Sequence, residues 1–172
     1  MDGSALRATQ APLKQRYREE PRAALVTLCA DGQLGDGLTC SVQTGQALVA
    51  AGLHPATGGD GFSACSGDML LQALVACAGV TLQAVATSLG ITLRSGRVHA
   101  EGELDFRGTL GVDKSAPVGF RDIRLSFDLD TDAAQDELDT LLRLTERYCV
   151  VLQTLRSAPT VTADIAAAGT PT

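Results

Sequence analysis

Two cysteines are the residues of this chain best placed to do chemistry. Cys77 lies within a run of residues 69–93 that carries no charged side chain, MLLQALVACAGVTLQAVATSLGITL. Cys149 lies in a second apolar stretch, TERYCVVLQTL over residues 145–155. Burial raises the pKa of a thiol and makes it inert, so either cysteine alone would be a packing residue. One cysteine on each of two predicted buried helices, far apart in sequence, is an arrangement suited to a thiol pair that the fold brings together.

The other cysteines and the two histidines are weaker candidates. Cys29 and Cys40 fall in strand patterns, which favours small core residues. Cys65 lies next to a predicted helix start and is a lesser redox candidate. Neither His54 nor His99 has the cysteine or acid spacing of a metal site or of a Cys–His nucleophile. A phosphate loop and a dinucleotide fingerprint are absent as well, so we expect no metal and no cofactor.

Composition limits the class of protein. The chain has 172 residues, of which 45% are hydrophobic, and this suits one compact domain with a core. Its net charge of −6 argues against nucleic acid as a partner. Five cysteines are too few for a disulfide scaffold, and no apolar segment of the secretory type opens the chain, so we expect a reducing, cytoplasmic location. Residues 1–22 have five of the basic residues and are predicted to form a solvated N-terminal arm.

The uncharged run over residues 69–93 is long enough to test as a membrane span. It contains polar glutamine, threonine and serine side chains and has no basic flank on its N-terminal side, so we favour a buried central helix and no membrane partner. Ser66 is a candidate N-cap and Asp68 suits the first turn of this helix. Gly90 is a candidate C-terminal stop.

Short strands are predicted before this helix. Residues 24–30 are apolar and precede the turn dipeptide Asp31-Gly32. Residues 38–42 alternate between apolar and polar side chains, and a turn leads into a further strand over 47–51. The Gly-, Pro- and Thr-rich segment 52–63 is predicted to be a loop.

Two longer strands are predicted after the helix. Residues 97–106 and 123–130 alternate between apolar and charged or polar side chains without a slip, which predicts two strands with one buried face each. The loop RGTLGVDKSAPVG, residues 107–119, connects them. Strands followed by a helix, strands, helices and a strand indicate an α+β fold, with one sheet face packed on the Cys-bearing helices.

The C-terminal part is predicted to be mainly helical. Thr131 or Asp132 is expected to cap a helix, which continues over residues 148–155 after a possible bend. Residues 160–165 alternate like a final strand. The tail over residues 166–172 is expected to be disordered, which leaves 23–165 as a single domain.

Three segments, taken together and in this order, resemble the OsmC/Ohr family of thiol-dependent hydroperoxide reductases. They are a Gly-rich loop leading into a helix, GGDGFSACSGDMLLQALVACAGVTL (residues 58–82), the linker RGTLGVDKSAPVGF (107–120), and the helix ERYCVVLQTL (146–155). The resemblance implies the OsmC-like fold, with antiparallel sheets packed on central Cys-bearing helices. It also implies an intertwined homodimer with its active sites at the interface.

The resemblance further implies a two-step chemistry. Cys77 would be the peroxidatic residue, whose thiolate is oxidised to a sulfenic acid. Cys149 would condense with it to a disulfide, and an external dithiol would restore both thiols. The apolar surroundings favour an organic hydroperoxide over hydrogen peroxide, because an alkyl chain gains from burial.

The chain departs from the family pattern at three places. The family's second cysteine is often followed by proline, and here Val150 follows. The family lowers the thiol pKa with an arginine held by a glutamate ten residues before the first cysteine, where this chain has Gly67. The family arginine usually comes from the strands before the helix, but no Arg or Lys occurs between residues 23 and 93.

Five residues are candidates for supporting or activating Cys77. Asp68 is the nearest acid, although it also suits an ordinary place in the first turn of a helix. Glu146 and Arg156 share the helix face of Cys149, and either could equally be an exposed charge. Arg18 and Arg22 could reach the thiol from the other subunit of a dimer.

Two alternative functions stay open. A member of the same fold could bind an apolar ligand in the interfacial pocket without turnover, an alternative that the missing arginine–glutamate pair favours. A general thiol–disulfide oxidoreductase is the other, and the absence of a CxxC motif counts against it.

Overall fold

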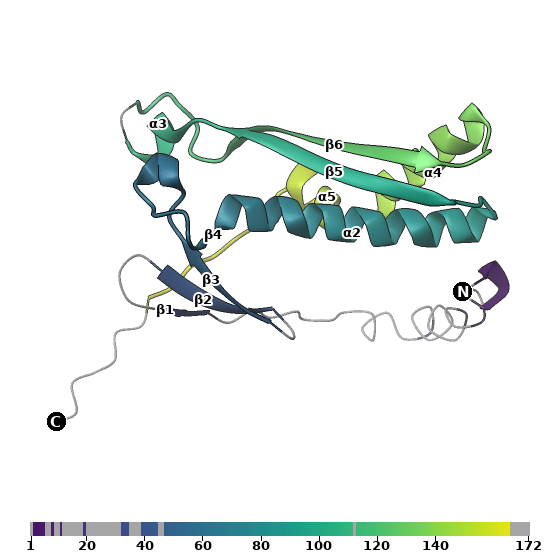
Figure 1. Cartoon of the computed structure of the whole chain (residues 1–172), viewed down its shortest axis with the longest axis horizontal. Coiled ribbons are helices and arrows are strands. Elements are labelled where there is room, and N and C mark those ends of the chain that lie inside the picture. The colour runs from purple at the N-terminus through teal and green to yellow at the C-terminus, as the bar shows by residue number, and fades with distance from the viewer. Residues whose placement is uncertain are drawn as a thin grey trace.

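The computed structural model describes residues 32–34, 39–44, 47–111 and 113–165, together with residues 2–5, 8, 11 and 19 near the N-terminus. The fold is α+β and consists of two sheets with helices between and beside them (Figure 1). Arg18, Arg22 and Cys29 lie outside the described residues, as do the strand predicted over 24–30 and the C-terminal tail.

The first sheet contains four short strands in the order β1-β2-β3-β4. They are β1 (Gly32–Leu34), β2 (Thr39–Thr44), β3 (Ala47–Gly52) and β4 (Ala64–Cys65). The hairpin predicted for β2 and β3 is confirmed, with Val42 opposite Val49. Gly32 of the predicted turn dipeptide begins β1 and pairs with Val42 of β2, whereas Asp31 lies outside the described residues.

The predicted loop between β3 and the central helix contains one 3-10 turn, η2 (Pro55–Thr57). The backbone of β4 then pairs in parallel with the end of β3, Gly52 opposite Cys65. Cys65 keeps this extended conformation, with φ −77° and ψ 129°, and is the cap residue of helix α2 (Ser66–Leu89). The prediction of Ser66 as the N-cap is therefore wrong by one residue.

Helix α2 is the central element of the fold. It ends at Gly90, whose φ of 76° is a left-handed conformation that glycine adopts readily, and this confirms the predicted stop. Only one stripe of α2 is buried, at Leu74, Ala78, Leu82 and Ala86. Val80, on another side of the helix, is 72% exposed. The predicted buried central helix is therefore buried along one stripe only in a single subunit.

On length and hydropathy alone, α2 would suit a membrane span, and it is the one helix in the described part of the chain that would. The core helix of a soluble protein meets the same criteria. The expectation that the protein has no membrane partner therefore stays a prediction.

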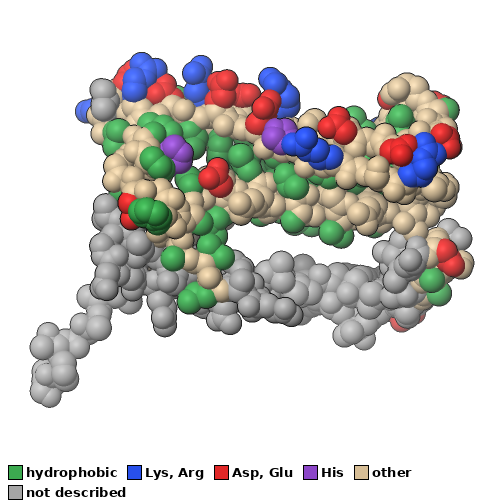
Figure 2. All heavy atoms as spheres, in the orientation of Figure 1, with side chains coloured by type: hydrophobic (Ala, Val, Ile, Leu, Met, Phe, Trp, Pro, Cys, Tyr) green, Lys and Arg blue, Asp and Glu red, His purple; other side chains and the backbone are tan. Residues whose placement is uncertain are grey.

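The second sheet is the long antiparallel pair β5 (Ser95–Leu104) and β6 (Phe120–Asp130), which lies along α2 (Figure 1). Its two predicted faces are confirmed: alternate side chains of each strand are partly buried and the others are exposed. Acidic and basic side chains gather along the outer edge of this pair (Figure 2). The predicted connecting loop begins with a helical turn instead, α3 (Phe106–Thr109), because the carboxylate of Asp105 accepts a hydrogen bond from the Arg107 N–H at 3.1 Å.

The C-terminal helices are α4 (Gln135–Tyr148) and α5 (Val150–Arg156). Neither predicted residue caps α4. The Thr131 hydroxyl donates to the Thr92 carbonyl at 2.7 Å, and the carboxylate of Asp132 pairs with Arg94. The helix begins after Ala134 instead, whose N–H donates to Glu137 at 2.9 Å.

The strand predicted over residues 160–165 is wrong. These residues form no strand, and every one of them is exposed, including Ile165 at 100%.

Candidate functional site

The fold brings Cys77 and Cys149 together in one core cluster. Cys77 lies near the middle of α2, and Cys149 is the single residue between α4 and α5. Cys149 is fully buried with Leu74 and Ala78, and Cys77 packs against this group from a half-buried position. Apolar side chains complete the cluster: Val98, Ala100, Ile123, Leu125, Phe127, Val151 and Leu152. Both cysteines are free thiols.

The surroundings of Cys77 lower its pKa below the ordinary value. Burial alone raises the pKa of this thiol, because it disfavours the thiolate. Hydrogen bonds to the sulfur outweigh burial, and they come from the Val151 N–H, the Cys149 thiol, the Val150 N–H and the Thr81 hydroxyl. These donors carry no net charge. In the described part of the chain, neutral donors rather than a cation therefore lower the pKa of Cys77.

The surroundings of Cys149 act in the opposite direction. Burial raises the pKa of this thiol, and although the Leu152 N–H lowers it, proximity to the Cys77 sulfur raises it further. The two sulfurs therefore differ in kind: the pKa of Cys77 lies below the ordinary value of a thiol and that of Cys149 lies above it. A nucleophilic thiolate with a protonated thiol beside it is suited to redox chemistry that ends in a disulfide.

Thr81 is a site residue that the sequence analysis did not single out. It follows Cys77 by one helical turn, and its hydroxyl donates to the Cys77 carbonyl at 2.8 Å. The same hydroxyl also reaches the Cys77 sulfur. The i, i+4 spacing of the two residues within the predicted helix is the signal that could have identified it.

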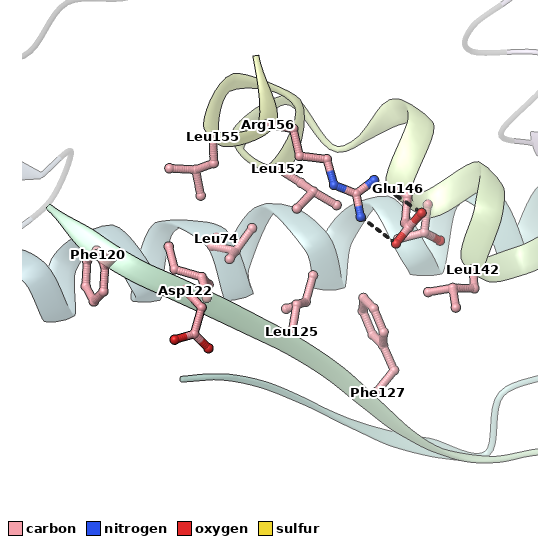
Figure 3. Close-up of a pocket in the computed structure, with 12 residues that line it drawn as sticks. Leu74, Phe120, Asp122, Leu125, Phe127, Leu142, Glu146, Leu152, Leu155 and Arg156 are labelled. Carbon is pink, nitrogen blue, oxygen red and sulfur yellow. Dashed lines mark hydrogen bonds and ion pairs between the residues drawn. The ribbon is translucent and has the colours of Figure 1, made fainter. Parts of the chain in front are cut away.

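Glu146 and Arg156 do not act directly on Cys77. They pair with each other instead, with Arg156 Nη2 at 2.8 Å from Glu146 Oε1 and Nη1 at 3.3 Å from Oε2 (Figure 3). Glu146 lies on the last turn of α4 and Arg156 is the last residue of α5, so the pair spans the bend at Cys149.

The other candidate residues lie apart from the thiol pair. Asp68 is exposed in the first turn of α2, the ordinary place for a helix N-terminal acid. A side chain at Gly67 would begin next to Phe120, Cys65 and Leu104. His54 stacks on Phe106 with ring centroids 5.0 Å apart, and His99 lies exposed on β5. Among the described residues, no group of three or more His, Cys, Asp or Glu side chains could hold a metal ion.

A cavity of about 350 Å³ lies between β6 and the two C-terminal helices (Figure 3). Leu74 and Leu152, which belong to the core cluster of the thiol pair, form part of its wall. Most of its wall is apolar, formed by Leu74, Phe120, Ile123, Leu125, Phe127, Leu142, Leu152 and Leu155. The Glu146–Arg156 pair and Asp122 supply charged groups. Thr145 also lines the cavity, and its hydroxyl oxygen is buried without a hydrogen-bond partner.

Comparison with solved structures identifies the fold. An OsmC-like protein from Mycoplasma pneumoniae superposes with a TM-score of 0.64 at 17% identity and covers 77% of this chain and 89% of its own. An organic hydroperoxide resistance protein from Elizabethkingia anophelis gives 0.63 at 15% identity, over 78% of this chain and 91% of its own. The organic hydroperoxide resistance protein OsmC from Legionella pneumophila gives 0.61 at 20% identity, over 78% and 92%. At these identities the likeness establishes the fold.

No significant sequence match was found among curated proteins. The family model described as OsmC-like protein matches residues 58–164, which is more than half of the chain and includes both Cys77 and Cys149. The predicted resemblance is therefore confirmed, and the chain belongs to the OsmC-like family.

Proposed function

We propose that this protein is a thiol-dependent peroxidase that reduces organic hydroperoxides with Cys77 and Cys149. The observation that carries the proposal is the asymmetric thiol pair: Cys77 has a lowered pKa and touches Cys149, whose pKa is raised. Family membership supports it, as do two similar structures that bear the name organic hydroperoxide resistance protein.

The proposed cycle has three steps. The Cys77 thiolate attacks one peroxide oxygen, which breaks the O–O bond, gives Cys77 sulfenic acid and releases an alkoxide that takes up a proton. The Cys149 thiol then attacks the Cys77 sulfur, which forms a disulfide and releases water. An external dithiol reduces the disulfide by thiol exchange and is itself oxidised. The cycle needs no metal or organic cofactor.

An organic hydroperoxide suits this site better than hydrogen peroxide does. The side chains around the cysteines are aliphatic or aromatic, and a bound alkyl chain removes its apolar surface from water at about 25 cal/mol for each Å² buried. Hydrogen peroxide has no apolar surface to bury.

We propose that the protein works as a cytoplasmic homodimer. Large hydrophobic side chains of α2 remain exposed in the single subunit, among them Val80 at 72%, Leu89 at 42% and Leu70 at 38%. A second copy of α2 would cover such a surface, since soluble monomers rarely expose large contiguous apolar patches. Arg18 and Arg22 of that second copy remain candidates for an additional charge near Cys77.

Replacement of Cys77 by serine tests the activity. We expect Cys77→Ser to abolish the turnover of cumene hydroperoxide with dithiothreitol and to leave the fold intact, because the volume change is small. Cys65→Ser is the matched control, since Cys65 lies at the start of the same helix and the cycle does not use it. Turnover by Cys77→Ser within twofold of the parent protein would contradict the assignment.

The second candidate function is the binding of an apolar ligand without turnover, and the cavity lined by β6, α4 and α5 favours it. Its apolar wall and the unpartnered Thr145 hydroxyl could hold an alkyl chain that carries one polar group. Saturable binding of an alkyl alcohol by both the parent and Cys77→Ser, together with a parent that turns over no hydroperoxide, would favour this second function.

A further inference from the structure

No helix-breaking residue in the sequence around it accounts for the bend between α4 and α5. Cys149 has φ −72° and ψ 107°, an extended conformation that interrupts the helix. The residues on either side, TERYCVVLQ over 145–153, include no proline or glycine. Proline and glycine are the residues that commonly end or kink helices, so contacts between side chains and backbone have to hold this bend.

The bend changes which backbone groups are paired. In an uninterrupted helix the N–H of Val150 would donate to the carbonyl of Glu146, four residues before it. Here α5 restarts at Val150, and its first hydrogen bond runs from the Gln153 N–H to the Cys149 carbonyl at 2.9 Å. The Val150 N–H is thereby free to reach the Cys77 sulfur. The Glu146 carbonyl loses its helical partner.

Three polar contacts connect α4 and α5 across the bend, where the helical hydrogen bond is missing, and all of them involve Glu146. The carbonyl of Glu146 accepts a hydrogen bond from Gln153 Nε2 at 2.7 Å. Its carboxylate pairs with both terminal nitrogens of Arg156, at 2.8 and 3.3 Å (Figure 3). One residue of α4 is thus tied to the middle and to the end of α5. Glu146 is also partly buried, and its side chain is 38% exposed, which limits competition from water.

We propose that Glu146, Gln153 and Arg156 form a clamp that holds the bend and so positions the Cys149 thiol and the Val150 and Val151 N–H groups on Cys77. This inference rests on the proposed roles of Cys77 and Cys149 and adds three positioning residues to them. None of the three side chains needs to touch the sulfurs. Straightening of the bend would pair both N–H groups with carbonyls of α4 and withdraw them from Cys77.

The ionisation of Cys77 should report on the clamp, because most of the polar groups that face its sulfur come from the bend. From the α4–α5 bend these are the Cys149 thiol and the two N–H groups, and from its own helix the Thr81 hydroxyl. From β5 and β6 the neighbours are apolar: Val98, Ala100, Ile123, Leu125 and Phe127. Cys149 is the titratable group among these neighbours, so loss of the clamp should be visible in the reactivity of both thiols.

The test uses the full chain with Arg156→Met, Gln153→Leu and the double variant. These changes keep an aliphatic stem and remove the polar groups. The first readout is the rate at which diamide, a two-electron thiol oxidant, converts Cys77 and Cys149 to a disulfide. The second is the pH profile of Cys77 alkylation by iodoacetamide. Arg143→Met is the matched control, because it removes the same charge from α4, where the described residues provide no ion pair for Arg143.

We expect the double variant to form the disulfide about tenfold more slowly, the combined effect of one hydrogen bond and one partly exposed ion pair. Its alkylation profile should move to higher pH, and Arg156→Lys should recover part of the lost rate. Arg143→Met should stay within twofold of the parent.

A double variant that matches the parent in both readouts would overturn the clamp, even if its melting temperature is lower. Equal slowing by Arg143→Met would overturn it as well. Diamide and iodoacetamide require no hydroperoxide, so the clamp can stand if the peroxidase proposal fails, and can fail if that proposal stands.

Discussion

Replacement of Thr81 by valine removes one neutral donor from the Cys77 thiolate and little else. The hydroxyl of Thr81 donates its single proton to the Cys77 carbonyl at 2.8 Å and is close enough to the sulfur to turn that proton towards the thiolate. Valine has nearly the same shape and no hydroxyl. Within α2 the Cys77 carbonyl keeps its helical N–H partner, so the substitution leaves no backbone group unpaired. The thiolate loses one donor, and the pKa of Cys77 should therefore rise.

The size of the effect follows from the strength of one hydrogen bond. A neutral hydrogen bond contributes about 0.5–1.5 kcal/mol, and about 1.4 kcal/mol corresponds to a tenfold change in an equilibrium. Alkylation depends on the thiolate fraction, so below the pKa the rate should fall about two- to twelvefold. Well above the pKa the thiol is ionised in both proteins and the two rates should converge.

The assay is the rate of iodoacetamide alkylation of Cys77 as a function of pH, followed by mass spectrometry of the Cys77 peptide. Thr81→Ser retains a hydroxyl and should retain most of the parent rate. Thr87→Val is the matched control, because Thr87 makes the same contact with the Gln83 carbonyl at 2.8 Å farther along α2. Superimposable profiles for Thr81→Val and the parent, or an equal shift in Thr87→Val, would refute the reasoning.

Three further predictions follow from the fold and the site. One equivalent of cumene hydroperoxide should produce an intrachain Cys77–Cys149 disulfide in peptide maps, and a bridge to Cys65 in its place would reassign the resolving residue. Light scattering should find a dimer at low micromolar concentration, because an intertwined interface would bury more than about 2,000 Å²; a monomer contradicts the proposed assembly. The side-chain hydrogen bond from Arg107 lowers the pKa of Asp105 to about 2. The stabilising effect of this carboxylate is therefore complete above about pH 4 and is lost as the pH falls through 2. Arg107→Met should raise the pKa of Asp105, measured by NMR titration, towards 3.8.

The parts of the fold that depend on side-chain period were predictable from the sequence. The alternation over residues 97–106 and 123–130 fixed which face of β5 and β6 is partly buried, because a one-residue slip would expose every apolar side chain. The end of α2 was predictable because Gly90 adopts a left-handed conformation. Elements that depend on tertiary partners were predicted less well: Thr131 and Asp132 would suit a cap, but the Thr92 carbonyl and Arg94 engage them.

The candidate site was predictable in its cysteines and only partly in their surroundings. Helical spacing placed Glu146 and Arg156 on the face of Cys149, but it could not show that they pair with each other across a bend. The sequence contains no sign of backbone activation, because every residue except proline has an N–H group and only the bend directs those of Val150 and Val151 at a sulfur. The donors that lower the pKa of Cys77 are therefore neutral groups that the sequence does not mark.

The opposite pKa shifts of the two thiols set an order of events in the proposed cycle. Before oxidation, burial and the nearby Cys77 sulfur both raise the pKa of Cys149, which favours Cys77 as the thiol that attacks the hydroperoxide in the proposed cycle. Sulfenic acid formation converts Cys77 to a neutral group, and the repulsion that opposed ionisation of Cys149 is removed. The N–H groups of Val151 and Leu152 already lower the pKa of Cys149. After oxidation they oppose only the rise in this pKa that burial causes. In the proposed cycle, oxidation of the first thiol thus activates the second, and a single bend in the backbone positions the donors for both steps.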